Sequence, residues 1–246
     1  MKASFIDGTQ DQKLDRDFFN IQVEFAKKLA KVSGQSFFDL LRTWTNLYGR
    51  LGLGKSLDAS NSIWQEFIAG GEEGAAERAY NIYMPPGHNS KKREKVWFGC
   101  FNPEYKPEKK TVYVHFGPKE KTVSPFDNLE KRKQELREMF EYIKNNYRDA
   151  QFVAGNSWLY NLEKYRNLFP LEYTAHMKVE EGTSADFNTW GQFVDRNQKT
   201  KPEARDMLLK KLESATTEQE VFDTVPLKAL SPQTTIDNFY RYYGIE

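Results

Sequence analysis

Histidines are the first candidates for chemistry in this sequence, at His88, His115 and His176. Their spacing fits no pattern of metal ligands, and neither H-E-x-x-H nor a paired H-x-H occurs, so we expect no metal. His115 is placed for catalysis because it ends an apolar segment that reads as a central strand, where a general base is often positioned. The alternative is a structural histidine, partly buried and hydrogen-bonded at the end of that strand.

A second candidate is the segment Gly49–Ser56, GRLGLGKS, which satisfies the phosphate-loop pattern G-x-x-x-x-G-K-[ST]. Such a loop needs a buried strand before it and, elsewhere, an apolar strand that ends in an aspartate for magnesium. The residues before Gly49 have helical spacing, and the strand that ends near His115 carries no such acid. The pattern therefore favours a glycine-rich helix end over a nucleotide-binding loop.

Two side chains could act as nucleophiles, Ser157 and Cys100. Ser157 follows a predicted strand in the order G-N-S-W-L, which departs from G-x-S-x-G, and we expect it to cap the next helix. Cys100 lies among Trp97, Phe98 and Phe101, which is typical of a small buried apolar residue. As the single cysteine, it excludes an internal disulfide framework and fits a reducing compartment.

The composition excludes several classes of partner. The chain has 36 Lys and Arg against 35 Asp and Glu, so no overall field attracts nucleic acid or an anionic membrane. No apolar run approaches the roughly 20 residues of a membrane span. The beginning of the sequence lacks the apolar core of a secretory signal, so we expect a cytoplasmic protein.

The stretch that must position these candidates runs from Thr111 to Pro170, in the order strand, loop, helix, strand, loop, helix. β-branched and aromatic residues mark the strands, and apolar residues at helical spacing mark the long helix, which we expect to begin at Ser124. Strands separated by a helix are typically parallel neighbours joined by a crossover. Their carboxyl ends bring together loops 115–124 and 155–159, and the first leads into a helix start whose amides could hold a phosphate.

The rest of the chain is predicted to be largely helical. Residues 1–84 form a helical subregion, residues 95–180 the sheet core, and residues 184–246 a second helical subregion. At 246 residues we interpret all three as one domain. The predicted fold class is therefore α/β (α+β), with a mixed sheet of about four to six strands.

Three local patterns make specific expectations at the margins of the sheet. Lys95–Phe101 predicts a strand, and the prolines in Asn102–Lys110 predict a loop that joins it to the strand before His115 as an antiparallel pair. Leu171–Val179 reads as a further strand. Ser231, which is followed by a proline, reads as the start of the last helix.

A family resemblance rests on VYVHFGPKEKTVSPFDNLEKRKQELREMFEYI followed by FVAGNSWLYNLEKYRNLFP. These segments are similar to the C-terminal part of GNAT-like acyltransferases of unassigned substrate, which carry a strand ending in His, a long helix, and SWL before a leucine-proline turn. The resemblance covers between a quarter and a third of the chain. It implies a GNAT-like core, an acyl-CoA cofactor, and transfer of the acyl group to an amine or hydroxyl.

The resemblance also implies roles for individual residues. Backbone amides of the loop after the strand would hold the cofactor pyrophosphate, and the implied residues are Phe116, Gly117, Lys119, Lys121 and Ser124. A tyrosine in the next helix, Tyr165 or Tyr160, would protonate the leaving thiolate, and His115 would be the base. Apart from the resemblance, Asn156, Ser157 and Trp158 are further candidates for binding because they follow the second predicted strand. The loop departs from the family pattern Q/R-x-x-G-x-G/A, because G-P-K-E-K has one glycine and a proline without an amide hydrogen.

The alternative function class is a non-enzymatic binding or interaction protein, whose aromatic clusters are core and surface patch. It predicts strands that stay paired to their ends and no pocket at their carboxyl edge. Acyl transfer instead predicts that an acyl-CoA binds and stabilises the protein.

Overall fold

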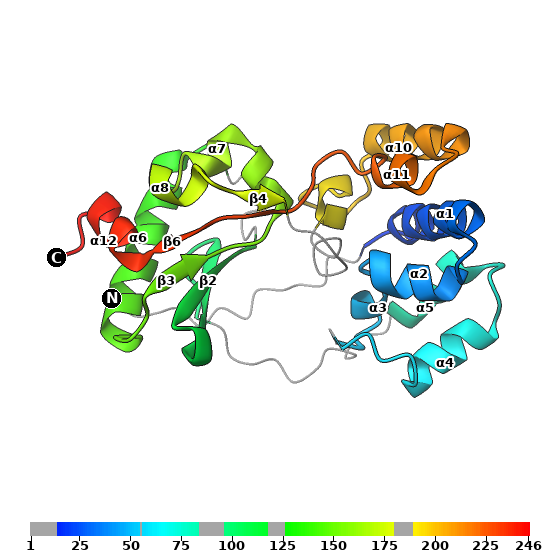
Figure 1. Cartoon of the computed structure of the whole chain (residues 1–246), viewed down its shortest axis with the longest axis horizontal. Helices are drawn as coiled ribbons and strands as arrows, with labels where there is room; N and C mark the ends of the chain where they lie inside the picture. Colours follow the sequence, from blue (N-terminus) through cyan, green and yellow to red (C-terminus); the bar gives the residue numbers. More distant parts are fainter. Residues whose placement is uncertain (1–13, 55, 84–95, 118–125, 180–188) are drawn as a thin grey trace. The chain divides into compact units, whose positions relative to one another are not determined.

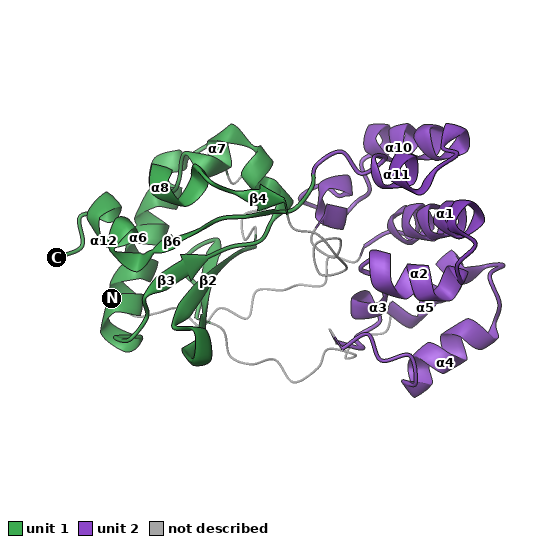
Figure 2. Ribbon diagram, viewed as in Figure 1, with its two compact units in different colours: residues 1–10, 93–180, 228–246 green, residues 11–92, 181–227 purple. Residues whose placement is uncertain are grey.

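The structure is a computed structural model that describes residues 14–54, 56–83, 96–117, 126–179 and 189–246 (Figure 1). Contacts divide the chain into two compact units, each with its own apolar core (Figure 2). Unit 1 contains residues 93–180 and 228–246, and unit 2 contains residues 11–92 and 181–227. Residues 228–246 therefore belong with the sheet. Whether both units unfold as one domain stays a prediction.

Among the described residues, unit 1 contains a mixed four-stranded sheet, which confirms the predicted fold class. In spatial order the strands are β1 (Phe101–Lys106), β2 (Thr111–Phe116), β3 (Phe152–Ala154) and β6 (Gln233–Thr235). β1 is antiparallel to β2, β2 is parallel to β3, and β3 is antiparallel to β6. A smaller antiparallel pair joins β4 (Lys178–Val179) to β5 (Leu230–Ser231).

The helix α6 (Leu129–Asn146) connects β2 to β3, so the predicted parallel pair with a helical crossover is confirmed. It begins later than Ser124, because Asn128 is the capping residue and its Oδ1 accepts a hydrogen bond from the amide of Lys131 at 2.9 Å. Its apolar face joins the same core as the strand residues Val112 and Val153, and its buried apolar side chains are Leu136, Met139, Phe140 and Ile143.

Short helices complete unit 1: η2 (Trp158–Asn161), α7 (Glu163–Arg166), α8 (Leu171–Thr174) and α12 (Ile236–Tyr243). Aromatic side chains supply much of their packing. Phe239 of α12 stacks on Phe140 of α6 with ring centroids 4.4 Å apart, and it meets Tyr173 of α8 edge-on at 4.9 Å. The tyrosines of these short helices consequently lie in an apolar interior.

The strand before β2 lies later in the chain than predicted, because β1 begins at Phe101. In the described part of the predicted strand Lys95–Phe101, Phe98 and Phe101 exchange two backbone hydrogen bonds in a tight turn, and the strand begins where that turn ends. The segment predicted as a loop is therefore mostly strand. Pro103 lies opposite Val114 on the outermost strand, where a residue without an amide hydrogen is tolerated. The antiparallel pairing with β2 is as predicted.

Two other expectations near the sheet are wrong. The predicted strand Leu171–Val179 begins as helix α8, and its extended part is the short β4. Ser231 does not start a helix, because β5 and β6 flank Pro232 and α12 begins at Ile236. A proline next to a serine fits the bend between two short strands as well as it fits a helix start.

Unit 2 is an assembly of helices around α1 (Arg16–Ser33). Its other described helices are α2 (Phe37–Trp44), α3 (Leu47–Arg50), α4 (Ser62–Ala69), α5 (Ala75–Tyr83), η3 (Trp190–Phe193), α10 (Pro202–Ser214) and α11 (Glu218–Phe222). Buried apolar side chains surround much of α1, among them Phe18, Phe19, Ile21, Val23, Phe25 and Leu29. Helices α2, α5, α10 and α11 accordingly all pack against it.

Asp15 ties together the two chain segments that form unit 2. Its Oδ1 caps α1 by accepting a hydrogen bond from the amide of Phe18 at 3.1 Å. The same carboxylate accepts hydrogen bonds from the hydroxyl and the amide of Thr200, at 2.5 and 2.8 Å. Arg205 and Asp17 add an ion pair between the same segments. The first helix is thus anchored to residues far away in sequence.

Candidate functional site

The parallel strands β2 and β3 stop pairing before β2 ends. Their register covers three residue pairs and finishes at Tyr113↔Ala154, whereas β2 continues to Phe116 in register with β1. After Ala154 the chain bonds on its other side, where the amide of Gly155 donates to the carbonyl of Pro232 at 3.1 Å. The pairing of the two parallel strands therefore ends before β2 does, and we call this point the strand separation; it lies at the edge where α/β proteins commonly place their sites.

Three aromatic rings gather at the end of β2, on the face that α6 covers. Phe116 stacks on Phe126 with centroids 5.5 Å apart. Tyr165 of α7 meets both rings edge-on, at 5.6 Å and 5.7 Å. Phe126 precedes α6 and Tyr165 follows β3, so segments that leave the two separating strands meet at these rings. Tyr165, a predicted proton donor, is therefore next to the strand ends.

Tyr160 and Tyr165 are buried together with a third tyrosine, Tyr173, and each is 1% exposed. The hydroxyls of Tyr160 and Tyr173 lie 3.0 Å apart, and the ring of Tyr165 lies 5.0 Å from that of Tyr160. Burial raises the pKa of all three hydroxyls well above the ordinary value for tyrosine. They therefore remain protonated at neutral pH and can donate hydrogen bonds.

His115 lies on the opposite face of β2 from Phe116 and pairs with Glu104 of β1. His115 Nε2 is 2.8 Å from Glu104 Oε2, and Lys106 Nζ is 2.5 Å from the other carboxylate oxygen. The hydrogen bond from Lys106, with a further one from His115, lowers the pKa of Glu104 to about 2. An ionised carboxylate that is hydrogen-bonded to an imidazole fixes the orientation of the ring. A general base requires such a fixed orientation. The predicted base and the predicted acid therefore lie on different faces of the sheet.

Gly117 follows β2 in a tightly packed position. Its amide donates to the carbonyl of Cys100 at 2.9 Å, and a Cβ added at this glycine would lie 2.9 Å from the ring of Trp97. The amide that the resemblance assigns to the cofactor is therefore engaged within the protein. A phosphate held at this loop would have to use amides of other residues.

A buried ion pair within α6 is hydrogen-bonded to the turn before β1. Arg132 and Glu135 of α6 bond at 3.1 Å, and the same Glu135 oxygen accepts a hydrogen bond from the amide of Cys100 at 3.1 Å. Arg132 also contacts the sulfur of Cys100. Gly99 has φ +55°, and a Cβ at this position would collide with the Glu135 carboxylate, so glycine is required here. Cys100 is fully buried as predicted, but its surroundings are not only apolar, because its sulfur contacts Arg132.

The other predicted binding residues fall into two groups. Lys119, Lys121 and Ser124 lie outside the described residues. Ser157 caps η2 as expected, because its Oγ accepts a hydrogen bond from the amide of Leu159 at 3.1 Å. Asn156 and Trp158 flank it and are partly buried. These three residues begin the segment that follows β3 where it leaves β2.

The segment Gly49–Ser56 belongs to unit 2, follows helix α2, and begins within α3, whose last residues are Gly49 and Arg50. Gly52 and Gly54 adopt left-handed conformations, with φ of 81° and 82°, and Lys55 lies outside the described residues. A phosphate loop requires a strand before it. The helices before this segment agree with the predicted glycine-rich helix end.

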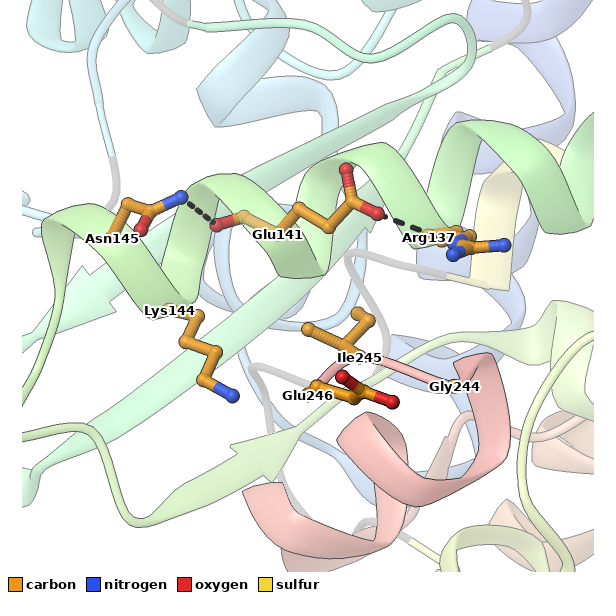
Figure 3. Close-up of a pocket in the computed structure, with 7 residues that line it drawn as sticks. All are labelled: Arg137, Glu141, Lys144, Asn145, Gly244, Ile245 and Glu246. Atoms are coloured by element: carbon orange, nitrogen blue, oxygen red, sulfur yellow. Dashed lines mark hydrogen bonds and ion pairs between the residues drawn. The ribbon is translucent and has the colours of Figure 1, made fainter.

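A groove of about 520 Å³ lies elsewhere in unit 1, between α6 and the segment after α12 (Figure 3). Its lining residues are Arg137, Glu141, Lys144, Asn145, Gly244, Ile245 and Glu246. Arg137 and Glu141 pair at 3.2 Å along the helix, and Lys144 lies 5.2 Å from the ring of Tyr240. This charged lining differs from the largely apolar pockets that usually bind small molecules.

Two residues that complete these arrangements, Glu104 and Tyr173, were not among the candidates from sequence. Glu104 lies in the segment read as a loop, and a strand there would have put it diagonally opposite His115. No local spacing links Tyr160, Tyr165 and Tyr173, because they lie on three separate short helices. Only the tertiary fold brings their rings together.

In the part of the chain that the structure describes, no helix has the length and apolar composition needed to cross a membrane. Within the same residues, no group of three or more His, Cys, Asp or Glu side chains could hold a metal ion. Comparisons with models of protein families, with curated proteins and with solved structures gave no match. The function is therefore argued from the geometry at the separating strands.

Proposed function

We propose that unit 1 binds an acyl-CoA where β2 and β3 separate and transfers the acyl group to an amine or hydroxyl. The observation that carries the proposal is the end of pairing at Tyr113↔Ala154 while β2 continues to Phe116. Strand ends without a paired neighbour can bond an extended ligand that has amides of its own. The pantetheine arm of CoA is such a ligand, because it is a narrow chain with two amide groups. In a sheet with only a structural role, we would expect β2 and β3 to stay paired up to their ends.

The residues around the separation can carry the proton transfers of this reaction. The acceptor forms a bond to the thioester carbonyl carbon, the carbon–sulfur bond breaks, and the sulfur leaves as a thiolate. His115, oriented by Glu104 at 2.8 Å, takes the proton that the acceptor loses. Tyr165 gives a proton to the thiolate. Its burial raises its pKa, so the proton is present at neutral pH.

The two faces of the sheet fit these separate roles. His115 and Phe116 are successive residues of β2, so their side chains point to opposite faces, and Tyr165 packs on Phe116. In a continuous sheet, the backbone of the neighbouring strand would lie between a side chain on one face and a side chain on the other. A ligand between separated strand ends is instead accessible from both faces. One face would then supply the base and the other the acid.

The element order of unit 1 supports the resemblance to GNAT-like acyltransferases. A parallel strand pair, a long crossover helix and short helices with a buried tyrosine occur in the order that the resemblance implies. The departure lies in the loop after β2, where the amide of Gly117 is bonded to Cys100. The proposal therefore assigns the diphosphate to this loop but not to Gly117.

Thermal unfolding with acetyl-CoA tests the proposal. A ligand that binds the folded state at a hundred times its Kd stabilises the protein by about 2.7 kcal/mol, so millimolar acetyl-CoA should raise Tm clearly. Phe116→Ala should reduce this shift, because it removes a ring at the strand separation. Tyr105→Ala is the matched control, because Tyr105 stacks on Tyr147 at 4.9 Å on the same side of the sheet but near the other end of β1. An unchanged wild-type Tm would rule out the proposed function.

A further inference from the structure

Helices α1 and α10 of unit 2 pack side by side and run in the same direction (Figure 1). Near their beginnings, Arg205 of α10 forms an ion pair with Asp17 of α1. Near their ends, Lys28 Nζ donates a hydrogen bond to the carbonyl of Glu213 at 3.1 Å. Because contacts join the two helices near both ends, their carboxyl-terminal turns lie together.

A groove of about 470 Å³ lies between these two helices. α1 contributes a polar stripe at helical spacing, and α10 contributes two leucines and a glutamate; the lining residues are Asn20, Glu24, Lys27, Lys28, Lys31, Leu209, Leu212 and Glu213. The stripe is half-buried or exposed, whereas Ile21, Phe25 and Leu29 on the other sides of α1 are buried. The groove therefore has one charged wall and one partly apolar wall.

Positive charge gathers at this groove although the whole chain is balanced. Residues 24–31 and 209–213 contain five lysines and two glutamates, whereas the chain has 36 Lys and Arg against 35 Asp and Glu. A lysine in the last turn of a helix offsets the negative end of the helix dipole, which accounts for Lys31 and Lys211. The dipole effect falls off within that turn, so it does not account for Lys27 and Lys28.

The ion pair that the lysine wall makes within the protein can be exchanged for another. Lys27 pairs with Glu24 at 2.9 Å on the same helix, and the two side chains are 40% and 39% exposed. Exposed pairs of this kind contribute little to stability, because solvent screens them. A carboxylate of a bound partner can therefore take the place of Glu24 beside Lys27 at little cost.

We propose that the groove between α1 and α10 binds an acidic amphipathic helix of a partner protein. The apolar side of this helix lies on Leu209 and Leu212, and carboxylates on its flank pair with Lys27 and Lys31. A helix in such a groove packs its side-chain ridges between those of the two helices. The stripe from Asn20 to Lys31 is roughly 17 Å long at the helical rise, so about three turns of the partner cover it. The binding involves unit 2 alone and is independent of the proposed acyl transfer.

The lining favours a helix over other ligands of a basic groove. A small molecule usually binds in a largely apolar pocket, whereas this lining is mostly polar. Single-stranded nucleic acid binds through aromatic side chains as well as cations, and the described lining residues include no aromatic ring. Its phosphates also carry charge at every nucleotide, so Glu24 and Glu213 would repel it. A helix can place its carboxylates opposite the lysines alone.

Peptide selection tests the proposal without knowledge of the partner. A display library of random peptides of about 14 residues, or about four helical turns, is selected on the full chain. We expect the enriched peptides to carry Asp or Glu beside apolar residues at helical spacing. The most enriched peptide is then labelled, and its affinity is measured by fluorescence anisotropy. Lys27→Glu with Lys31→Glu should weaken its binding by about tenfold, because two attractions become repulsions.

Two matched controls separate the groove from general charge and general packing. Arg196→Glu with Lys199→Glu makes the same change of charge in the segment before α10, at the other end of the helix pair, and should leave the affinity as in the wild type. Leu209→Ser keeps every charge and should weaken binding, because it removes an apolar contact. Met207→Ser should not, because Met207 of α10 is 54% exposed and lies outside the groove.

Four outcomes would overturn the inference. The first is a selection that enriches no peptide, or only peptides without the acidic and apolar pattern. The second is an equal loss of affinity in Arg196→Glu with Lys199→Glu, which would show a general charge effect. The third is tighter binding of a labelled single-stranded RNA through Lys27 and Lys31. The fourth is a dimer of the wild-type chain in sedimentation that Lys27→Glu with Lys31→Glu dissociates, because a second copy would then occupy the groove.

Discussion

The two units bury different kinds of polar group. In unit 2, Gln22 accepts a hydrogen bond from the amide of Asn46 at 3.0 Å and donates to the carbonyl of Phe18 at 3.0 Å. Thr45 donates to the carbonyl of Leu41 at 2.5 Å. These side chains are neutral and satisfy backbone groups where helices end and begin. They hold helices together, and none of them changes charge near neutral pH.

Unit 1 buries a charged pair and a group of tyrosines, whereas the fully buried tyrosine of unit 2, Tyr48, donates to the carbonyl of Asp58 at 2.9 Å. Arg132 and Glu135 form an ion pair whose side chains are 1% and 11% exposed. The hydroxyls of Tyr160 and Tyr173 lie beside Gly155, and the ring of Tyr165 lies 5.0 Å from that of Tyr160. Buried ionisable groups cost stability unless they are paired, and they concentrate at functional sites more than in ordinary cores. The contrast between the units therefore lies in the buried ion pair of unit 1.

The largest expected effect comes from breaking the ion pair of unit 1. Arg132→Ala leaves the buried carboxylate of Glu135 without its cation, so we expect the free energy of unfolding to fall by about 4 kcal/mol. Urea denaturation measures it. Replacing both partners, as Arg132→Met with Glu135→Leu, should recover most of the loss, because no charge is then left buried. A double variant as unstable as the single one would contradict this account.

The second-largest effect is expected from a cavity in the core of unit 2. It tests whether the two units unfold together. Leu29 of α1 is fully buried in unit 2, and Leu29→Ala should cost about 3 kcal/mol through the cavity it creates. If the chain is one domain, as the sequence predicts, hydrogen exchange should lose protection in both units by a similar amount. Loss of protection confined to unit 2 would show two independent domains, and the difference between the units would then extend to their stability.

The central part of unit 1 was predictable because its signals are local. β2, α6 and β3 each carry their own periodicity, and a helix between two strands implies parallel pairing. Two of the failures share one cause, since Pro103 and Pro232 made their segments read as a loop and a helix start. Proline is compatible with edge strands and bends, but only the sheet as a whole shows which strands lie at an edge.

The candidate site was less predictable than the fold. His115 and Tyr165 followed from their positions after two strands and from the resemblance. Their partners did not, because Glu104 depends on the register of β1 with β2 and Tyr173 on the packing of short helices. The separation of β2 from β3 left no trace in composition or periodicity. It depends on backbone bonding of residues after Ala154 to a segment distant in sequence.

A smaller effect is expected from the polar contacts of unit 2. Asp15→Ala removes the cap of α1 and also the bonds to Thr200, so it should cost about 2 kcal/mol. Thr217→Ala removes the local capping box of α11 and should cost about 1 kcal/mol. Chemical denaturation of both variants measures the difference. Equal losses would mean that the bonds between the two chain segments contribute little.

The smallest effect concerns the exposed charges of unit 1. The pKa of Glu104 is lowered from 4.5 to about 2, mainly by the hydrogen bond from Lys106. A carboxylate with a depressed pKa in the folded state contributes stability that is present above pH 4.5 and is lost as the pH falls toward about 2. The side chains of Glu104 and His115 are 42% exposed, so solvent screening keeps the contribution below about 1 kcal/mol.

Glu104→Gln should therefore flatten the pH dependence of stability within that interval, and Lys106→Met should flatten it nearly as much. Both variants keep His115 in place, so any difference between them reports on the bond between His115 and Glu104 at 2.8 Å. If Lys106→Met leaves the acid slope intact while His115→Gln removes it, the imidazole is the main partner of the carboxylate. That result would strengthen the case for Glu104 as the residue that orients the base, and it would separate this pair from the neutral polar contacts of unit 2.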